Sequence, residues 1–366
     1  MVFYLRKYIT HIPGTASFVD KNTISITNGK NEITASAKNF IIATGSSSIE
    51  IPNIPVDEKQ IVSSTGALSL SKIPKSLLVI GGGYIGLEMG SVWSRLGSKV
   101  TVVEALDRIV PTMDGEIAKE FMKMLTKQGL EFKLSHKVSS AKSSKSGVDV
   151  EMETSDKKKI KENYEIVLMS VGRKPNTEGL GLEKIGIKLT DKKSIEIKEN
   201  FKTSVEGIYA IGDVAPGPML AHKAEEEGVA CVEFIKGQKP HINYDAIPAI
   251  VYTNPEIASV GKTEEQLKQE KKDFKVGKFP FMANGRALTT SASEGFVKIL
   301  VDKKTDEILG AHIIGHDAGQ LIAEIVTTIE FGGSAEDIAR VCHAHPTTSE
   351  AVKEAALSVD GRAIHI

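Results

Sequence analysis

The pattern of apolar and polar positions divides the chain into segments of different character. Short alternating runs at 15–20, 22–27 and 32–45 predict β-strands. The last run contains an apolar strand from Asn39 to Ala43. The next segment, 49–58, is rich in proline and predicts a surface connection.

From residue 75 onward the pattern is typical of an α/β fold. Residues 76–105 predict a buried strand, a glycine turn, a helix and a second strand. An amphipathic helix follows and ends at Gly129. Its apolar positions are Ile117, Phe121, Met124 and Leu125. Residues 147–172 predict a polar hairpin, with its solvated turn at the lysines 157–159, that leads into a buried strand.

The rest of the chain predicts a mixed domain. A strand from Gly207 to Ile211 precedes a long helix. After Pro240, strands at 249–253 and 295–302 alternate with helices such as 316–332, which is an α+β pattern.

Composition limits the classes of partner. The chain has 366 residues, 41% apolar and 25% charged, which predicts a globular protein of two to four domains. The net charge of −1 gives no reason to expect nucleic acid or an acidic membrane as partner. No apolar run approaches the roughly 18 residues that span a bilayer. The two cysteines, Cys231 and Cys342, form no disulfide framework and fit a reducing compartment, and Cys342 is interpreted as inert packing.

The clearest chemical signal is a glycine motif between the strand and the helix of 76–105. Gly81-Gly82-Gly83-Tyr84-Ile85-Gly86 matches G-x-G-x-x-G in its expected context. The first glycine permits a tight turn, Gly83 permits close approach of a pyrophosphate, and Gly86 permits close packing of helix and strand. Glu104 ends the next strand and is placed to accept hydrogen bonds from ribose hydroxyls, which favours NAD(H) over NADP(H). Arg108, four residues later, keeps NADP(H) open as the alternative.

Three further strands end in a glycine, at Gly45, Gly172 and Gly212. Open α/β sheets bind ligands at this edge, although any one of these glycines is also compatible with an ordinary turn. Asp213 is either a turn residue or an acceptor for ribose or ribityl hydroxyls. Glu88, one turn into the glycine-motif helix, either interacts with the helix dipole or faces the reacting end of a cofactor.

The segment "HAHPTTSE", 343–350, contains a candidate proton carrier. Thr347 and Glu350 fit a capping box of the next helix, which is one explanation of Glu350. In the other, His345 is a general acid or base and Glu350 fixes its tautomer. His343 and His345 alternate as metal ligands can, but no third ligand stands at a recognised spacing, so no metal is expected.

Together these motifs resemble the dihydrolipoamide dehydrogenases, the E3 components of 2-oxo acid dehydrogenase complexes among the class I flavin disulfide reductases. The resemblance rests on "GGGYIGLEMGSVWSRLGSKVTVVE", "VGRKPNT", "YAIGDVAPGPMLAHKAEEEG" and "HAHPTTSEAVKEAALS", which occur in this order. It implies a Rossmann-like NAD domain inserted into a partial FAD domain, followed by an α+β dimerisation domain. The corresponding boundaries are 1–70 and 179–245 for the FAD domain, 71–178 for the NAD domain and 246–366 for the dimerisation domain.

The resemblance also implies roles for individual residues. Catalysis falls to His345, as the base for dihydrolipoamide thiols across a homodimer interface, with Glu350 behind it. The residues that would hold NAD are Gly81, Gly82, Gly83, Tyr84, Ile85, Gly86, Leu87, Glu88, Glu104, Val138 and Gly172. Those that would hold FAD are Gly14, Thr44, Gly45, Ser46, Asp213, Met219, Leu220, Ala221 and His222.

In that family the proton's partner is a disulfide in a C-x-x-x-x-C segment near the N-terminus, which this sequence does not contain. We therefore expect an N-terminally truncated chain. The implied partners are lipoyl domains and the E2 core. The implied location is the cytoplasm of a bacterium or the mitochondrial matrix of a eukaryote, since no targeting segment is seen. The alternatives are a non-catalytic, self-associating NAD-binding fragment, or another flavin disulfide reductase such as glutathione or mercuric reductase.

Overall fold

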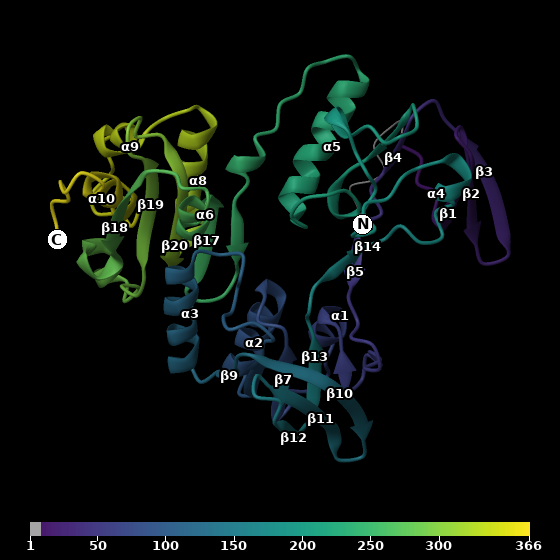
Figure 1. Cartoon of the computed structure of the whole chain (residues 1–366), viewed down its shortest axis with the longest axis horizontal. Helices are drawn as coiled ribbons and strands as arrows, with labels where there is room; N and C mark the ends of the chain where they lie inside the picture. The colour runs from purple at the N-terminus through teal and green to yellow at the C-terminus, as the bar shows by residue number, and fades with distance from the viewer. Residues whose placement is uncertain (1–8) are drawn as a thin grey trace. The chain divides into compact units, whose positions relative to one another are not determined.

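The computed structural model describes residues 9–366, so the first residues of the chain, on which the expectation of truncation partly rests, lie outside the description. The described chain forms two compact units (Figure 1). One contains residues up to Ser47 together with Arg173–Ile242, and the other contains Ser48–Gly172 and Asn243–Ile366. Among the described residues, no helix combines the length and the apolar sequence needed to cross a bilayer.

The first unit is built from small sheets and one long helix. Its strands are β1 (Thr15–Asp20), β2 (Thr23–Asn28), β3 (Asn31–Ser36), β4 (Phe40–Ile42), β14 (Arg173–Pro175) and β15 (Ile208–Ala210), and β5 (Ser46–Ser48) lies at its border. Its helices are α4 (Leu182–Ile185), η1 (Glu199–Phe201), η2 (Gly212–Val214) and α5 (Ala221–Ile235). Strands β1–β3 form an antiparallel meander, β4 pairs in parallel with β15, and β5 pairs with β14. The predicted run 32–45 is therefore two strands in different sheets.

The second unit begins with a five-stranded sheet in the order β6-β13-β7-β8-β9, whose strand pairs are all parallel. Its elements are β6 (Ile61–Val62), α1 (Ser64–Leu68), β7 (Ser76–Ile80), α2 (Tyr84–Arg95), β8 (Lys99–Val103), α3 (Gly115–Lys127), β9 (Glu131–Lys133), β10 (His136–Ser144), β11 (Gly147–Thr154), β12 (Lys159–Tyr164) and β13 (Ile166–Met169). Strands β10–β12 form a separate antiparallel sheet. The predicted hairpin is β11–β12, whereas β10 was not predicted.

Alternation along β7 explains the layers around the parallel sheet. Leu77 and Val79 belong to the apolar core shared with α2 and α3, while Leu78 and Ile80 belong to the core shared with β10 and β11. Successive side chains of a strand point to opposite faces, so a strand that is covered on both faces is apolar throughout. The parallel sheet therefore lies between a helical layer and the antiparallel sheet.

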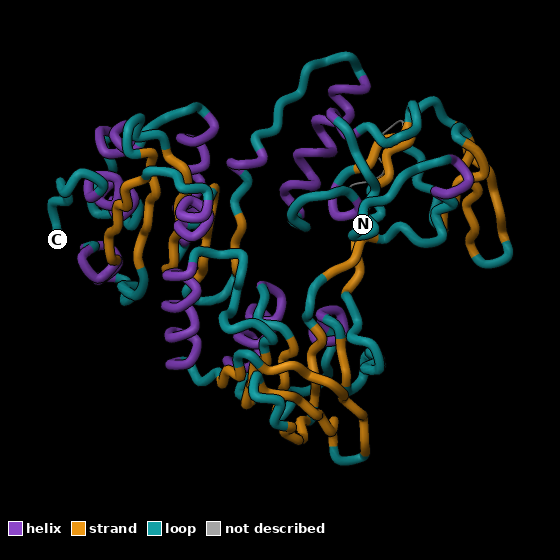
Figure 2. The backbone as a smooth tube through the Cα atoms, in the orientation of Figure 1, coloured by secondary structure: helices purple, strands orange, loops and turns teal. Residues whose placement is uncertain are grey.

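The C-terminal half of this unit is an antiparallel sheet in the order β16-β17-β20-β19-β18 (Figure 2). Its elements are η3 (Tyr244–Ala246), β16 (Ala249–Val251), β17 (Glu256–Gly261), α6 (Glu264–Gln269), β18 (Phe274–Pro280), η4 (Phe281–Ala283), α7 (Gly285–Thr289), β19 (Phe296–Asp302), β20 (Ile308–Gly315), α8 (Ala318–Glu330), α9 (Ala335–Arg340) and α10 (Glu350–Ser358). Helices α8, α9 and α10 share a core with the sheet. Ile257, Phe296 and Ile314 instead join the core that contains α2 and α3.

The unit borders differ from the predicted domain borders 1–70 and 71–178. The change of unit occurs after Ser47 rather than near residue 70, and the return occurs at Arg173 rather than near residue 179. The reason is strand pairing, because β6 at Ile61–Val62 pairs with β13 at the edge of the parallel sheet. Residues 48–70 therefore belong with the parallel sheet.

Candidate functional site

The glycine loop between β7 and α2 has the geometry that its sequence predicts. Gly81 has φ of 107°, and a Cβ atom there would lie 2.4 Å from the Ser170 carbonyl oxygen. A Cβ at Gly86 would lie 2.2 Å from the Gly81 oxygen and 3.0 Å from Val79, so only glycine lets the helix pack this close to the strand. A Cβ at Gly83 would meet nothing within 4 Å. The open space lies where a bound phosphate would approach.

A cavity of about 330 Å³ opens at this loop and lies wholly within the second unit. It is lined by Ser48, Ser64, Gly81, Gly83, Tyr84, Ile85, Glu104, Leu106, Pro111, Met169, Ser170, Val171 and Gly172. We call it the nucleotide cavity. Gly83 is the N-cap of α2, and no side chain caps the helix there. The first amides of the 12-residue helix are therefore available to an anion.

Glu104 closes the far side of the loop. Its Oε2 accepts a hydrogen bond from the Gly82 amide at 2.7 Å, and its Oε1 accepts one from the Leu106 amide at 2.8 Å. The carboxylate thus lies on the cavity wall at the carboxyl end of β8. Arg108 is engaged elsewhere: its Nη2 donates to the Pro111 carbonyl oxygen at 2.7 Å, and its Nη1 lies 3.7 Å from Glu265. The arginine that kept NADP(H) open therefore has partners within the loop and on α6.

Five of the predicted NAD residues do not line the cavity. Gly82 and Gly86 shape the loop, and Leu87 is fully buried in the core. Val138 lies on β10, is 4% exposed and packs in the core behind the parallel sheet.

Glu88 is the fifth of these residues, and its carboxylate faces the C-terminal half of the unit. Its Oε1 accepts a hydrogen bond from the Tyr252 amide at 2.8 Å. Burial raises the pKa of this carboxyl above its ordinary value, and the Tyr252 amide opposes the rise. Glu88 therefore contacts the segment that contains Tyr252, in addition to its interaction with the helix dipole.

The predicted FAD residues near β4 and β15 lie together in the first unit. Ser46 Oγ donates to the Asp213 carboxylate, and Arg173 Nε donates to Ser46 Oγ at 2.7 Å. Arg173 Nε also lies 4.0 Å from Asp213 Oδ2. We call these three residues the Ser46–Asp213 cluster. Asn176 fixes Thr44 and Gly45 beside this cluster. Its side-chain Nδ2 donates to the Thr44 carbonyl oxygen at 3.0 Å, and its backbone N–H donates to the Gly45 carbonyl oxygen at 2.9 Å.

A buried ion pair holds the turn that carries Asp213. Lys223 and Glu227, one turn apart on α5, are 1% and 0% exposed and lie 3.0 Å apart. Glu227 Oε2 accepts a hydrogen bond from the Gly212 amide at 2.7 Å. Neither residue was predicted from the sequence. The available signal was a lysine and a glutamate four positions apart in "AHKAEEEG", a spacing that pairs charges on one helix face.

The other predicted FAD residues are dispersed along the first unit. Leu220 is the N-cap of α5, Ala221 and His222 begin that helix, and Met219 precedes them. Gly14 precedes β1 with φ of 155°, and a Cβ there would lie 2.8 Å from the Thr27 oxygen. The close contact with β2 therefore requires a glycine at position 14.

His345 and Glu350 form the predicted pair. His345 Nδ1 lies 2.9 Å from Glu350 Oε1, and the imidazole is 75% exposed. Because an ionised carboxylate can only accept, Nδ1 carries the hydrogen and Nε2 is left to face solvent. Glu350 Oε2 accepts from the Thr347 amide at 2.8 Å. Burial would raise the pKa of Glu350, but the Thr347 amide and His345 outweigh it and hold that pKa below its ordinary value.

The capping-box interpretation of Thr347 and Glu350 was wrong in detail. Helix α10 begins at Glu350, its N-cap is Ser349, and no side chain caps it. The Thr347 hydroxyl donates to the Ala344 oxygen instead, at 2.7 Å. Glu350 therefore uses one oxygen for the segment that precedes the helix and the other for His345.

The neighbouring groups have separate roles. His343 Nε2 lies 2.7 Å from Glu324 of α8. Within residues 9–366, no three His, Cys, Asp or Glu side chains are grouped so as to hold a metal ion.

Cys342 is exposed, so its interpretation as buried packing was wrong, whereas Cys231 is buried. Burial and the nearby Glu227 raise the pKa of the Cys231 thiol to about 11.

Comparison with known proteins identifies the family. Residues 1–228 match the family model described as pyridine nucleotide-disulphide oxidoreductase, and residues 247–356 match the dimerisation domain of the same class. Dihydrolipoyl dehydrogenase 1, mitochondrial, of Arabidopsis thaliana is 55% identical over 367 residues, covering 99% of this chain and 72% of the relative. Leghemoglobin reductase of Glycine max is 54% identical over 359 residues, covering 97% and 68%.

A solved structure agrees with this assignment. LpdA from Mycobacterium tuberculosis is similar with a TM-score of 0.87 and 27% identity, covering 94% of this chain and 76% of LpdA. The chain therefore belongs to the dihydrolipoyl dehydrogenase family of the pyridine nucleotide-disulphide oxidoreductases, NAD-dependent oxidoreductases that act on sulfur groups and bind FAD and NAD(H).

Proposed function

We propose that this chain carries the NAD-binding and proton-accepting parts of a dihydrolipoyl dehydrogenase, and that the redox-active disulfide lies outside these 366 residues. The overall reaction oxidises a dihydrolipoyl dithiol to its disulfide and reduces NAD⁺ to NADH with release of one proton. The observation that carries the proposal is the combination of the nucleotide cavity with the His345–Glu350 pair.

The residues of the nucleotide cavity suit NAD(H). The open space at Gly83 and the uncapped first turn of α2 fit a pyrophosphate, which is anionic and needs amide donors. Glu104 would accept from ribose hydroxyls at the acceptor sites that its bonds to the Gly82 and Leu106 amides leave open. The same carboxylate would repel a 2′-phosphate. Tyr84, Ile85 and Gly172 would complete the walls of the site.

His345 is proposed to accept the thiol proton. Its Nε2 is the free, exposed ring nitrogen, and its Nδ1–H is oriented by Glu350. A carboxylate behind an imidazole fixes the tautomer and stabilises the imidazolium that forms when the proton arrives. The proton therefore moves from a substrate sulfur to Nε2, and Glu350 remains ionised throughout.

Bound FAD would supply the capacity for two-electron transfer between the dithiol side and the nicotinamide. The Ser46–Asp213 cluster, with Thr44 and Gly45 beside it, fits the polar part of such a group because Asp213 and Ser46 can accept from hydroxyls. Gly14, and the segment Met219, Leu220, Ala221 and His222 at the start of α5, are proposed as further contacts of FAD. Among the NAD residues, Leu87, Glu88 and Val138 are proposed to support the site from its core and its rear wall.

The two cysteines support the placement of the disulfide elsewhere. Cys231 is buried with a raised thiol pKa, and Cys342 is exposed on a different unit. A thiolate is the reactive form, so a buried thiol with a raised pKa is a poor relay. We further propose a homodimer through the dimerisation domain, lipoyl domains and an E2 core as partners, and a location in the bacterial cytoplasm or the mitochondrial matrix.

The test uses two preparations. The purified chain, mixed with FAD, NAD⁺ and dihydrolipoamide, is expected to bind NADH but to form no NADH from the dithiol. Lipoamide-dependent turnover by this chain alone would overturn the placement of the disulfide outside it.

The second preparation joins this chain to the preceding segment of the Arabidopsis relative. In that flavoprotein, His345→Gln is expected to lower kcat for dihydrolipoamide by about 10²–10⁴, the usual contribution of a general base. NADH binding should stay unchanged. Full activity of the His345→Gln variant would contradict the proton-accepting role.

A further inference from the structure

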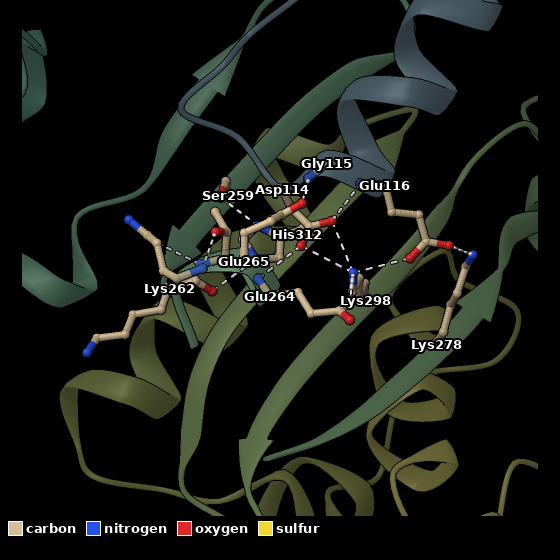
Figure 3. Close-up of polar contacts among 12 residues, drawn as sticks. Asp114, Gly115, Glu116, Ser259, Lys262, Glu264, Glu265, Lys278, Lys298 and His312 are labelled. Atoms are coloured by element: carbon tan, nitrogen blue, oxygen red, sulfur yellow. Dashed lines mark hydrogen bonds and ion pairs between the residues drawn. The ribbon is translucent and has the colours of Figure 1, made fainter. Parts of the chain in front are cut away.

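A buried cluster of charges joins the nucleotide half of the second unit to its C-terminal sheet (Figure 3). Lys298, on β19 between β20 and the edge strand β18, is 1% exposed, and Asp114, immediately before α3, is 0% exposed. Lys298 Nζ lies 3.0 and 3.2 Å from the two oxygens of Asp114. It also lies 2.6 Å from Glu264 and 3.2 Å from Glu116. We call these four residues the Lys298 cluster.

The charges of the cluster are balanced only when Lys298 is present. Three carboxylates surround one ammonium group, and the exposed lysines Lys268 and Lys278 pair with Glu264 and Glu116 at the rim. Asp114 has no other cation among its described ion pairs. Burial opposes ionisation of Asp114, but His312 and Lys298 outweigh it and hold the pKa of that carboxyl below its ordinary value. Removing one partner of such a pair leaves an uncompensated buried charge.

Asp114 is also the end of a loop that forms one side of the nucleotide cavity. The loop runs from Glu104 to Asp114, and Leu106 and Pro111 line the cavity. At its start, Glu104 accepts from the Gly82 amide. In its middle, the Val110 amide donates to the Gly82 oxygen at 2.8 Å.

At its end, the loop is fixed to residues of the C-terminal half. Asp114 Oδ2 accepts from the Glu264 amide at 3.2 Å, and the Gly115 amide donates to Glu265 Oε1 at 3.0 Å. Asp114 Oδ1 accepts from the Glu116 amide, which caps α3. The loop is therefore attached to the glycine loop on one side and to the C-terminal sheet and α6 on the other.

We propose that Lys298 is a positioning residue for the nucleotide site: through Asp114 it holds the 104–114 loop in the conformation that binds NAD(H). Lys298 touches neither the cavity nor its lining residues, so its effect on affinity passes through the loop. The proposal makes the C-terminal domain part of the nucleotide site, and it rests on the proposed binding of NAD(H) in that cavity.

The test is an NADH titration, followed by nucleotide fluorescence, of the full chain and five variants. Asp114→Asn keeps an oxygen that can cap α3 but removes the charge, so it is the primary variant. We expect its Kd for NADH to rise about tenfold. The Kd of Lys298→Met for NADH should rise at least as far. Lys298→Arg keeps the charge, so its Kd should stay close to that of the wild type.

Two controls separate positioning from general loss of stability. Lys275→Met breaks an exposed ion pair with Asp360 on the same sheet, and it should leave Kd unchanged. Ile325→Val removes a methyl group from the core between α8 and the C-terminal sheet, and it should lower stability without changing Kd.

Hydrogen exchange supplies a local measurement that does not require an active enzyme. In Asp114→Asn, the amides of Val110 and Glu116 should exchange at least tenfold faster, while those of β7 should not. Wild-type affinity together with wild-type exchange at Val110 in a folded Asp114→Asn chain would overturn the positioning role. Absence of NADH binding by the wild-type chain would instead overturn the proposed function, so the two failures are distinguishable.

Discussion

At the glycine loop, backbone groups face an open cavity, whereas in the Ser46–Asp213 cluster the polar side chains are bonded to one another. The first site exists because Gly81, Gly83 and Gly86 carry no side chains. It lies at the carboxyl ends of strands in a five-stranded sheet. The second lies beside the two-stranded β4–β15 sheet, and its turn is fixed by the buried pair Lys223–Glu227. The shape of the nucleotide cavity thus depends on close packing around glycines, whereas the position of Asp213 in the Ser46–Asp213 cluster depends on a buried charge pair.

The largest expected effect follows from breaking the buried pair in the first unit. Lys223→Met removes the buried ammonium group that lies 3.0 Å from the Glu227 carboxylate, so we expect a loss of about 3–5 kcal/mol of unfolding free energy. Urea denaturation measures it. Lys223→Met with Glu227→Gln should recover most of the loss, because the amide oxygen still accepts from Gly212.

The matched control for that prediction is an exposed pair. Lys123 lies 3.1 Å from Glu120 on α3 and is 75% exposed. Lys123→Met should cost no more than about 0.5 kcal/mol. An equal cost for the two lysine substitutions would contradict the assignment of the first unit's stability to the buried pair.

The second prediction separates the glycines of the nucleotide loop. Gly86→Ala forces a methyl group against the Gly81 oxygen and Val79, so we expect a loss of about 3 kcal/mol in stability and of measurable NADH binding. Gly83→Ala meets no neighbour, so its stability should change by less than about 0.5 kcal/mol.

The Gly83→Ala methyl group would, however, project into the open space where a phosphate approaches. Its Kd for NADH should therefore rise about tenfold, equivalent to about 1.4 kcal/mol. Paired thermal melts and NADH titrations of the two variants check this. Equal stability of Gly86→Ala and Gly83→Ala would refute the packing argument.

The sequence predicted the nucleotide half-site better than the other half. The strand, loop and helix at 76–95 follow from local periodicity and glycine spacing, and the structure confirms them. The His345–Glu350 contact also follows from a short segment. By contrast, Lys298 and Asp114 are 184 positions apart, and neither has a local pattern that distinguishes it from a surface charge. Long-range ion pairs depend on how sheets pack, which periodicity does not report.

The smallest of the expected effects concerns His312 beside the Lys298 cluster. Its Nε2 donates to the Lys262 oxygen at 3.1 Å and its Nδ1 lies 2.7 Å from the Ser259 hydroxyl, so Nδ1 accepts from that hydroxyl when the ring is neutral. Burial lowers its pKa below 6.5; Asp114 and Glu265 oppose that shift, while Lys298 adds to it. A base with a lowered folded pKa costs stability as pH falls below its unfolded pKa.

The resulting pH prediction is a difference between two chains. Relative to His312→Gln, the wild-type chain should lose up to about 1.4 kcal/mol of stability per pH unit below pH 6.5, until the folded pKa is reached. Above pH 7 the difference should be constant. Urea titrations at several pH values measure it. A constant difference from pH 7 to pH 5 would mean that the pKa of His312 is the same in the folded and the unfolded chain, and would contradict this prediction.

The proposed role of the nucleotide cavity depends most directly on nucleotide binding by the glycine loop and Glu104. The deciding measurement is a fluorescence titration of the purified chain with NADH and, in parallel, with NADPH. We predict saturable binding of one NADH per chain and at least tenfold weaker binding of NADPH, because the Glu104 carboxylate repels the 2′-phosphate. No saturable NADH binding, or equal affinity for NADPH, would contradict the assignment of this cavity to NAD(H).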